Sequence, residues 1–565
     1  MEEGESVLIL VDELRSEDHN TKLHAINSLS EIAEAIGADK SREELIPFLG
    51  EMLEDDSDEV LLALASKLGD LADAVGKDYI SVLLPLLQIL ASNEEEVIRD
   101  RAVTSLVRLA GLMDARQHLA DFLPLVKVLA DADSYGARIS SCALFASACR
   151  PGPADCQDDL LKSFIELAHD DSPVVRRAAA SSLSDLIAAV HPEAHSELLK
   201  LFEVLAVDEH DSVRQMACES AIKMLPVRPA FLPLIKNCGS DRSWRVRYSV
   251  AISLERLYEA VASVEELLPM VLSWLSDSET EVRGASAMKL PLIMLKLSPA
   301  TVLSQILPAL EPLSRDSSAH VKIALIQTIC QLPAVLGADS TVTKLLPLIS
   351  DLLRDEAYEV RLAFSEGLLE FCKGFAPDEL CAFVLPLCLT LMADLQWHVR
   401  LRTVESLTQL VPLLGPERFK ERLSEALVKW AEDPVFAVRE AVLEVLAQLA
   451  SPLGTAWVNS VMQPFLKRLS VHAVFTKRMI TLVALTKLHK VLYPQDLVDL
   501  LGRLASDPVP NIKFNTAKAI KLLGGLSNAA MRQAHFVPLL QRLKRDPDFD
   551  VRYFATDALK TLANS

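Results

Sequence analysis

The chain has 565 residues, a net charge of −21 and 50% hydrophobic residues, of which few are aromatic. The acidic balance argues against a nucleic-acid-binding or anionic-membrane surface, because phosphate groups are bound by clustered Lys and Arg. The apolar residues are mostly Leu, Ala, Val and Ile, which is typical of many thin helix-on-helix layers and not of one bulky core.

The first residues, Met1 to Glu5, are acidic and lack the basic-then-apolar order of a signal peptide, so we expect no export. Apolar runs such as Ile80 to Ala91 are interrupted or shorter than the ~20 residues that cross a bilayer. Nine cysteines occur without a CxxC pair, and we interpret them as reduced thiols. These features together indicate a cytoplasmic protein, with the nucleus as a second location.

A basic residue returns about every 39 positions through the chain, and fourteen of the fifteen anchor positions hold Lys or Arg. Eleven anchors have an Asp six residues upstream. A period of this size predicts a stacked-repeat solenoid of about fifteen units, a single elongated domain over residues 1–565. The anchors are Lys22, Leu61, Arg99, Arg138, Arg176, Arg214, Arg247, Arg283, Lys322, Arg361, Arg400, Arg439, Arg478, Lys513 and Arg552.

Each unit has the pattern of two antiparallel helices, which predicts an all-α superhelix. A Pro commonly lies eight residues before the Asp, inside an apolar stretch that we expect to form a first helix bent at the Pro. A short turn follows the Asp, and the second helix contains the anchor. Seven residues after the anchor stands a large aliphatic residue, as in Leu183, Leu368 and Leu407, and this spacing predicts one buried stripe.

The recurring Asp and Arg have a structural interpretation. A carboxylate at the turn and a guanidinium in the next helix can bond each other, the backbone or the adjacent repeat, forming a ladder along the stack. Because the Asp and Arg recur in most units, we expect them to stabilise the stacked repeats and not to form a binding or catalytic site. The ladder residues that we single out are Asp170, Arg176, Asp277, Arg283, Asp394 and Arg400.

Two helices per unit, without a strand signal, identify HEAT-type repeats. Three segments, Asp170 to Ala180, Asp241 to Tyr248 and Asp507 to Asn515, resemble the scaffolding A subunit of protein phosphatase 2A, as does Val11 to Arg15. The resemblance covers the whole chain, with the same number and order of repeats. It implies a non-catalytic scaffold that holds both an interchangeable regulatory B-type subunit and a phosphatase catalytic subunit.

In the amino-terminal repeats, approximately residues 1–390, the turns are acidic or carry Pro, Trp and Arg. Charge runs such as those around Asp58 and Glu95 are usually solvated faces. The resemblance implies that these repeats receive the regulatory subunit. We expect the contacts at Pro173, Arg177, Trp244 and Arg245, with Asp58 and Glu95 steering a basic partner surface.

Three repeat spacings are short: Arg214 to Arg247, Arg247 to Arg283, and Arg478 to Lys513. Missing residues shorten a helix or loop and change the rotation between layers. The two spacings within 214–283 lie next to the expected regulatory site, so we hypothesise that curvature or partner choice differs there.

The position three before each anchor is aromatic in seven of the fifteen turns. Four of these residues, Tyr358, Trp397, Phe436 and Phe475, fall in successive repeats. Such rings anchor protein interfaces when exposed, although each can instead fold back over its own turn. The resemblance implies that repeats of residues 391–565 hold the catalytic subunit, and it assigns the contacts to Trp397, His398, Phe436, Phe475, Arg478 and Asn511.

An enzyme and a transport receptor are the alternatives. The histidines are scattered, and the near pair His191 and His195 lies in a polar connection that lacks the three or four converging groups of a metal site. We find no phosphate-binding loop, nucleophile elbow or zinc-protease motif, and expect neither activity, metal nor cofactor. A nuclear transport receptor or another HEAT adaptor is built from the same stacked helix pairs. Pull-down of a phosphatase catalytic subunit or of a small GTPase distinguishes these alternatives.

Overall fold

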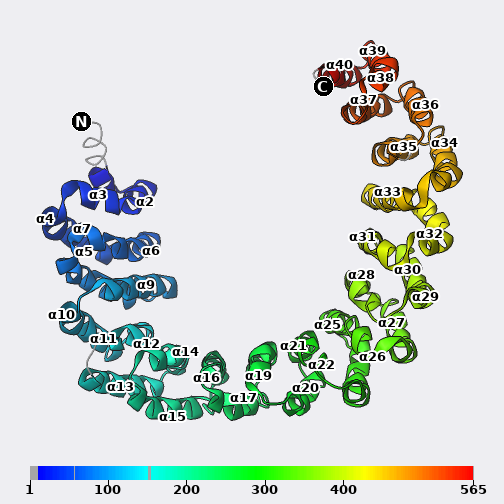
Figure 1. Ribbon diagram of the computed structural model, residues 1–565. Coiled ribbons are helices and arrows are strands. Elements are labelled where there is room, and N and C mark those ends of the chain that lie inside the picture. The colour runs from blue at the N-terminus through cyan, green and yellow to red at the C-terminus, as the bar shows by residue number, and fades with distance from the viewer. Residues whose placement is uncertain (1–9, 56, 151–153, 491, 564–565) are drawn as a thin grey trace. The chain divides into compact units, whose positions relative to one another are not determined.

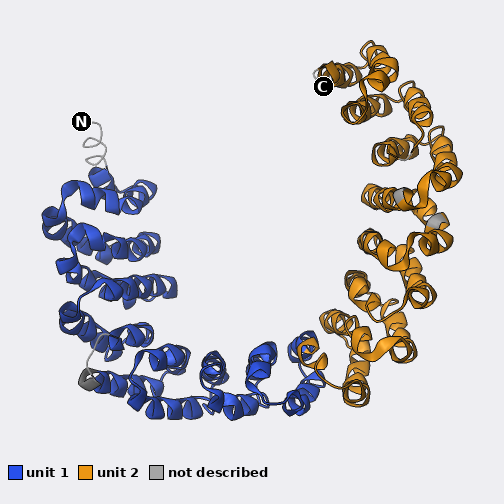
Figure 2. Ribbon diagram, viewed as in Figure 1, with its two compact units in different colours: residues 1–289 blue, residues 290–565 orange. Residues whose placement is uncertain are grey.

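The computed structural model describes residues 10–55, 57–150, 154–490 and 492–563. Every regular element in these segments is a helix. The chain forms two compact units, residues 1–289 and 290–565 (Figure 2). Within each unit the helices lie in two rows, a first-helix row and a second-helix row, and the helices of one row contact their neighbours in sequence of repeats (Figure 1).

Unit 1, as far as it is described, contains the second helix of the first repeat, the helix pairs of the second to seventh repeats and most of the eighth. Its first-helix row consists of α5 (Ile46–Asp55), α8 (Leu84–Ala91), α11 (Leu123–Ala130), α13 (Ala154–Ala168), α15 (His195–Leu205), α17 (Leu232–Cys238) and α20 (Leu268–Leu275). Its second-helix row consists of α2 (His19–Asn27), α3 (Leu29–Ile36), α6 (Asp58–Lys67), α7 (Ala72–Val75), α9 (Glu96–Leu112), α12 (Tyr135–Cys149), α14 (Pro173–Ala189), α16 (Asp211–Met224), α18 (Trp244–Ile252), α19 (Leu254–Ala260) and α21 (Thr280–Lys289). The single-turn helices α4 (Ala38–Lys40) and α10 (Ala115–Gln117) connect repeats.

Unit 2 continues the same pattern. Its first-helix row consists of α24 (Leu307–Leu310), α27 (Leu346–Leu352), α30 (Leu385–Met392), α32 (Pro416–Trp430), α34 (Gln463–Leu469), α36 (Pro494–Leu504) and α39 (Val537–Leu543). Its second-helix row consists of α22 (Pro291–Met294), α25 (Ala319–Ile329), α28 (Tyr358–Cys372), α31 (Trp397–Leu414), α33 (Phe436–Trp457), α35 (Phe475–Leu488), α37 (Pro510–Gly525) and α40 (Phe549–Ala563). The connections contain α23 (Pro299–Thr301), α26 (Pro333–Ser340), α29 (Pro377–Glu379) and α38 (Ala529–Met531).

The recurring Pro acts at the start of the first helix. In α30, for example, Pro386 is the second residue, and a five-residue π-helical turn, Leu380–Val384, lies directly before the helix. Pro has no N–H and its ring crowds the carbonyl four residues earlier, so the turn before it departs from α geometry. The departure is a π turn before α30 and a 3₁₀ turn, Lys77–Leu83, before α8, where Pro85 is likewise the second residue. The predicted bend is therefore an altered turn in front of the helix.

The missing residues of the short repeats come from this same turn. Short 3₁₀ turns, Pro229–Phe231 and Val264–Glu266, replace it before α17 and α20, and α36 begins directly at Pro494. The helix rows continue through all three places. Whether this shortening changes partner choice stays a prediction.

The buried stripe of the second helices is present as the sevenfold spacing predicts. Twelve of the thirteen large aliphatic residues at this position have no solvent exposure, and Leu559 in the last helix is partly exposed. Each stripe packs between its own first helix and the neighbouring second helices, so the core is a series of thin layers. The twelve residues are Leu29, Leu68, Leu106, Leu183, Leu254, Leu290, Ile329, Leu368, Leu407, Leu446, Leu485 and Ile520.

Eight of the nine cysteines are free thiols, and the side chain of Cys156 lies outside the described residues. Within the described segments, no single helix has the length and hydropathy needed to cross a bilayer. Two bent helix pairs, Ala319–Ile329 with Pro333–Leu352 and Phe436–Ala450 with Pro452–Leu469, pass that test by length and composition only.

Candidate partner-binding ridge

The anchor arginines join consecutive repeats. The guanidinium of Arg176 donates through Nε and Nη2 to the two carboxylate oxygens of Asp208 in the next repeat, at 2.7 and 3.1 Å. Arg400 binds Asp433 in the same way, at 2.7 and 3.0 Å. Such two-point contacts fix distance and orientation together, so each rung holds two neighbouring layers in register.

Further rungs among the described residues repeat this arrangement, and all of them use an Asp of the following repeat. The arginine rungs are two-point contacts, and the lysine rungs are single contacts. The pairs are Arg138 with Asp170, Arg214 with Asp241, Arg247 with Asp277, Lys322 with Asp355, Arg361 with Asp394, Arg478 with Asp507, and Lys513 with Asp546.

Inside one repeat the Arg reaches the backbone and not the Asp side chain. Nη1 of Arg176 donates to the carbonyl oxygens of Asp170 and Asp171, and Arg283 does the same to Asp277 and Ser278. The carboxylate of Asp170 accepts the backbone N–H of Ser172, which closes the turn. The spacing therefore predicts the ladder correctly, but it does not reveal that the carboxylate and guanidinium of one repeat bind different neighbours.

The ladder carboxylates have depressed pKa values. Burial alone would raise the pKa of Asp208, but the hydrogen bonds from Arg176 and from the backbone of His210 outweigh burial and hold it below its usual range. The same balance lowers the pKa of Asp241, Asp277 and Asp394. These rungs are thus ionised throughout the neutral range.

Acidification is expected to weaken the stack. A depressed carboxylate contributes stability that is fully present above its unfolded pKa, near 3.8, and is lost as pH falls through the lower folded value. The urea midpoint should therefore stay constant between about pH 5 and 7 and fall steeply below about pH 4. A midpoint that is the same at about pH 2.5 as at about pH 7 would contradict the ladder's role.

The four aromatic residues of the carboxy-terminal half occupy the same structural position. Tyr358, Trp397, Phe436 and Phe475 are the first residues of α28, α31, α33 and α35, which lie side by side in unit 2 (Figure 1). We call these four residues the aromatic row. None is buried: Phe436 and Phe475 are 50% and 41% exposed, and the other two are partly exposed.

His398 links two members of this row. Its ring stacks on Trp397 at a centroid distance of 3.8 Å and lies 6.2 Å from the ring of Tyr358, with both pairs nearly parallel. His398 itself is exposed. Three rings from two adjacent repeats therefore form one stacked aromatic cluster, the kind of group that partners use as an anchor.

Two other residues of the expected catalytic-subunit contact differ in placement. Asn511 is exposed at the start of α37, where its side chain accepts a hydrogen bond from Asn515 at 2.7 Å. Arg478 is only 8% exposed and is a rung of the ladder, bound to Asp507 and to the carbonyl of His472. Arg478 is better explained as part of the layer than as a contact, so we leave it out of the candidate site.

The amino-terminal residues form two separate groups. Pro173 begins α14, with Arg177 exposed one turn later. Arg245 lies over the ring of Trp244 at 5.2 Å and contacts Asp211 of the preceding repeat at 3.3 Å. Because α16 separates α14 from α18, a partner must span a full repeat to touch both groups.

Asp58 and Glu95 are exposed at the starts of α6 and α9, as expected for a solvated acidic face. The side chains of Asp55 and Asp56, in the same acidic run, lie outside the described residues. The sequence analysis did not predict the ion pair between Arg245 and Asp211. The two residues are 34 positions apart, close to one repeat, but neither is an anchor residue, so the repeat pattern does not single them out.

Across the described segments, no three His, Cys, Asp or Glu side chains come together as a metal-binding group. The exposed turns thus offer aromatic, cationic and acidic surface. Their geometry suits recognition of another protein.

Comparison with family models finds a HEAT repeat at residues 160–190 and the PIK3R4-like middle domain at residues 230–499. Among curated proteins, the regulatory A subunit of protein phosphatase PP2A from Schizosaccharomyces pombe is 38% identical over 266 residues, which is 45% of each chain. The PP2A scaffold subunit of Dictyostelium discoideum is 41% identical over 198 residues, 35% of this chain and 34% of that protein.

The chain is a homologue of the PP2A regulatory A subunits. The beta isoform of the 65 kDa regulatory A subunit from Rattus norvegicus is 44% identical over 181 residues, which is 32% of this chain and 30% of that protein. In each of these matches the chain spans less than half the length of the relative. The similarity is therefore not confined to the three repeat segments quoted above. It covers longer stretches of named A subunits from several eukaryotes.

Solved structures support the fold alone. A Kap95p structure with RanGDP covers 100% of this chain and 77% of its own, with a TM-score of 0.63 and 16% identity. The Kap95:Nup1 complex covers 100% and 82%, with a TM-score of 0.56 and 13% identity. At such identities the likeness reports the helical solenoid, so the transport-receptor alternative gains no support from it.

Proposed function

We propose that this chain is a non-catalytic scaffold of a protein phosphatase 2A type assembly. The observation that carries the proposal is its 38 to 44% identity to proteins named as PP2A regulatory A subunits or scaffold subunits in distant eukaryotes. The aromatic row adds physical support, since exposed rings at equivalent turns give a partner several anchors in one line. A cytoplasmic location, with the nucleus as a second one, is part of the proposal.

In this proposal the repeats of residues 391–565 bind the phosphatase catalytic subunit, through Trp397, His398, Phe436, Phe475 and Asn511. The repeats of residues 1–390 bind a B-type regulatory subunit. The contacts there are Pro173, Arg177, Trp244 and Arg245, with Asp58 and Glu95 as the acidic surroundings.

The scaffold acts by raising effective concentration. A substrate recruited by the regulatory subunit is held near the active site of the catalytic subunit on the same chain, so a bimolecular encounter becomes an intramolecular one. Each repeat touches only its neighbours, so small rotations between layers add up and let the ends adapt to different partners. The chain itself performs no chemical step.

Reconstitution tests the proposal. The purified chain, mixed with a B-type subunit plus a PP2A catalytic subunit, should give a complex with one copy of each in size-exclusion chromatography with light scattering. A chain that binds neither subunit, yet binds a Ran-type GTPase, would overturn the proposal in favour of the transport-receptor alternative.

A further inference from the structure

Two rungs of the ladder lack their carboxylate. The residues at the ladder position opposite Arg99 and Arg439 are Ala132 and His472, where most other repeats have Asp. Within the described part of the chain, these two arginines alone have a buried Nε–H without a hydrogen-bond partner. A buried donor left unsatisfied is destabilising, so each broken rung is a place where an added carboxylate is favoured.

His472 preserves the turn but not the rung. Its Nδ1 accepts the backbone N–H of Val474 at 3.0 Å, the role that the Asp carboxylate has in other turns. Since Nδ1 accepts, the neutral imidazole carries its proton on Nε2 and has no acceptor left for Arg439. The sequence change from Asp to His thus removes the acceptor while the turn geometry remains.

The neighbouring carboxylates are already used. Asp433 binds Arg400, and Glu432 binds Arg468 and Lys477 together. No Asp or Glu occurs between Glu444 and Asp496, a stretch that contains six Lys and Arg. Five of these six cations are paired with carboxylates outside the stretch, namely Asp496, Glu432, Asp507 and Glu444, so these carboxylates are committed to partners other than Arg439.

Electrostatics separates Arg439 from the complete rungs. Burial lowers the pKa of Arg439, with only the charge of Asp433 opposing it. Hydrogen bonding to Asp208 and Asp507 instead raises the pKa of Arg176 and Arg478. Arg439 therefore carries a desolvation cost that the charge of Asp433 offsets only in part.

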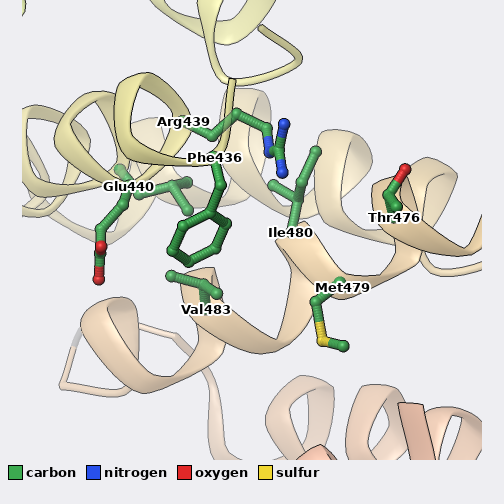
Figure 3. Close-up of a pocket in the computed structure, with 8 residues that line it drawn as sticks. Phe436, Arg439, Glu440, Thr476, Met479, Ile480 and Val483 are labelled. Atoms are coloured by element: carbon green, nitrogen blue, oxygen red, sulfur yellow. The ribbon is translucent and has the colours of Figure 1, made fainter. Parts of the chain in front are cut away.

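A shallow hollow borders Arg439 between α33 and α35. Most of its lining is apolar and includes Phe436, Ile480 and Val483, and Glu440 and Thr476 are its other polar members. Figure 3 shows the ring of Phe436 directed toward Val483 and the guanidinium of Arg439 beside Ile480, while Glu440 points away from Arg439. Exposed apolar side chains rim this joint: Phe436, Val471, Val474 and Phe475 are 50%, 64%, 50% and 41% exposed.

Arg99 is the natural contrast. It is only 6% exposed and lies against Gly136, where a Cβ would be 3.3 Å from Cδ of Arg99. The exposed residues around it, Glu94, Glu95, Glu96, Asp131 and Asp133, are acidic and would repel a partner's carboxylate. Arg439 as a residue is partly exposed while Arg99 is buried, so of the two broken rungs the one at Arg439 is the more open to an acidic group.

We propose that the partner of the aromatic row inserts one Asp or Glu side chain, flanked by apolar residues, between Phe436 and Phe475 and so completes the rung at Arg439. The inference deepens the proposed function and rests on it, since it states what chemistry the phosphatase catalytic subunit must present at this joint. Docking at Arg439 also ties α33 to α35, so partner binding stiffens the one joint of this row that the chain leaves without a carboxylate.

The test is to supply the missing carboxylate in cis. His472→Asp should complete the rung, slow hydrogen exchange in α33 and α35, and weaken binding of the catalytic subunit by at least about 10-fold, because Arg439 is then occupied and a second carboxylate is repelled. Ala132→Asp is the matched control: it completes the other broken rung and should leave this affinity unchanged. His472→Asp with wild-type affinity and slower exchange would overturn the inference, since it would make the rung purely structural.

A second probe separates this inference from the proposed function. If the wild-type chain does not bind the catalytic subunit, the proposed function is wrong, and the site is judged with a capped peptide that carries one Glu between Val and Phe residues and with its Gln twin. The Glu peptide should bind at least about 10-fold more tightly by calorimetry, and His472→Asp should abolish the difference. Equal binding of the twins, or no binding of either, would overturn the inference.

Discussion

Replacement of Asp507 by Ala is expected to lower the free energy of unfolding of the carboxy-terminal repeats by about 3 kcal/mol. Asp507 and Arg478 form the most buried rung, at 7% and 8% exposure, with contacts of 2.6 and 2.8 Å. Removing the carboxylate leaves a buried guanidinium with an unsatisfied Nε–H, the condition already present at Arg439. Urea unfolding, followed by hydrogen exchange in α35 and α37, measures the loss.

The control for this prediction is the double variant Arg478→Met with Asp507→Ala. It removes the charge together with its partner, so the loss should be clearly smaller than in the single variant. Because each repeat contacts only its neighbours, exchange in α9 and α12 should not change in either protein. Equal losses in the single and double variants would show that packing, and not the unpaired charge, explains the effect.

Replacement of Trp397 and Phe436 together by Ala should weaken binding of the phosphatase catalytic subunit by about 100-fold or more. The reason is that two exposed anchors of the aromatic row are lost, and the stacked surface of Trp397, His398 and Tyr358 with them. Binding of a B-type subunit should remain. Surface-plasmon or calorimetric titration with each purified subunit measures the two affinities.

Two variants serve as controls for that result. Tyr135→Ala removes an aromatic residue that is 57% exposed and occupies the same turn position in a repeat outside residues 391–565. It should leave catalytic-subunit binding unchanged. Trp244→Ala with Arg245→Ala should give the opposite pattern, with loss of only the B-type subunit. If the Trp397 and Phe436 variant binds the catalytic subunit like the wild type, the aromatic row is not the contact surface.

Much of the layer could be predicted because its determinants are local and repeated. The Asp, the anchor and the aliphatic residue seven positions later recur in most repeats, so the pattern is distinguished from coincidence by its many copies. The second helices begin where this pattern predicts, and they bury the predicted stripe. An aromatic residue recurs at one turn position, and this recurrence likewise predicts that the rings lie at equivalent positions in successive repeats. The width of the turn before each Pro was missed, because π geometry depends on the fit of the first helix to its neighbours and not on a motif.

The site divides differently between sequence and structure. The resemblance assigns a contact role to Arg478, yet its guanidinium is enclosed by Asp507 and the backbone of the preceding turn. Conversely, the change of Asp to His at position 472 is visible in the repeat pattern, but its meaning depends on Arg439, whose orphaned donor is apparent only when neighbouring repeats are stacked.

The sequence by itself therefore determined the period, the helix pairs and the buried stripe, since these depend on residue spacing along one chain. The resemblance to PP2A A subunits came from particular segments of that sequence. The tertiary structure decided which carboxylate each guanidinium binds, which turns stay open, and where the ladder lacks an acceptor. These are properties of contacts about 30 residues apart, and the geometry of two stacked layers selects them from several pairings that the spacing allows.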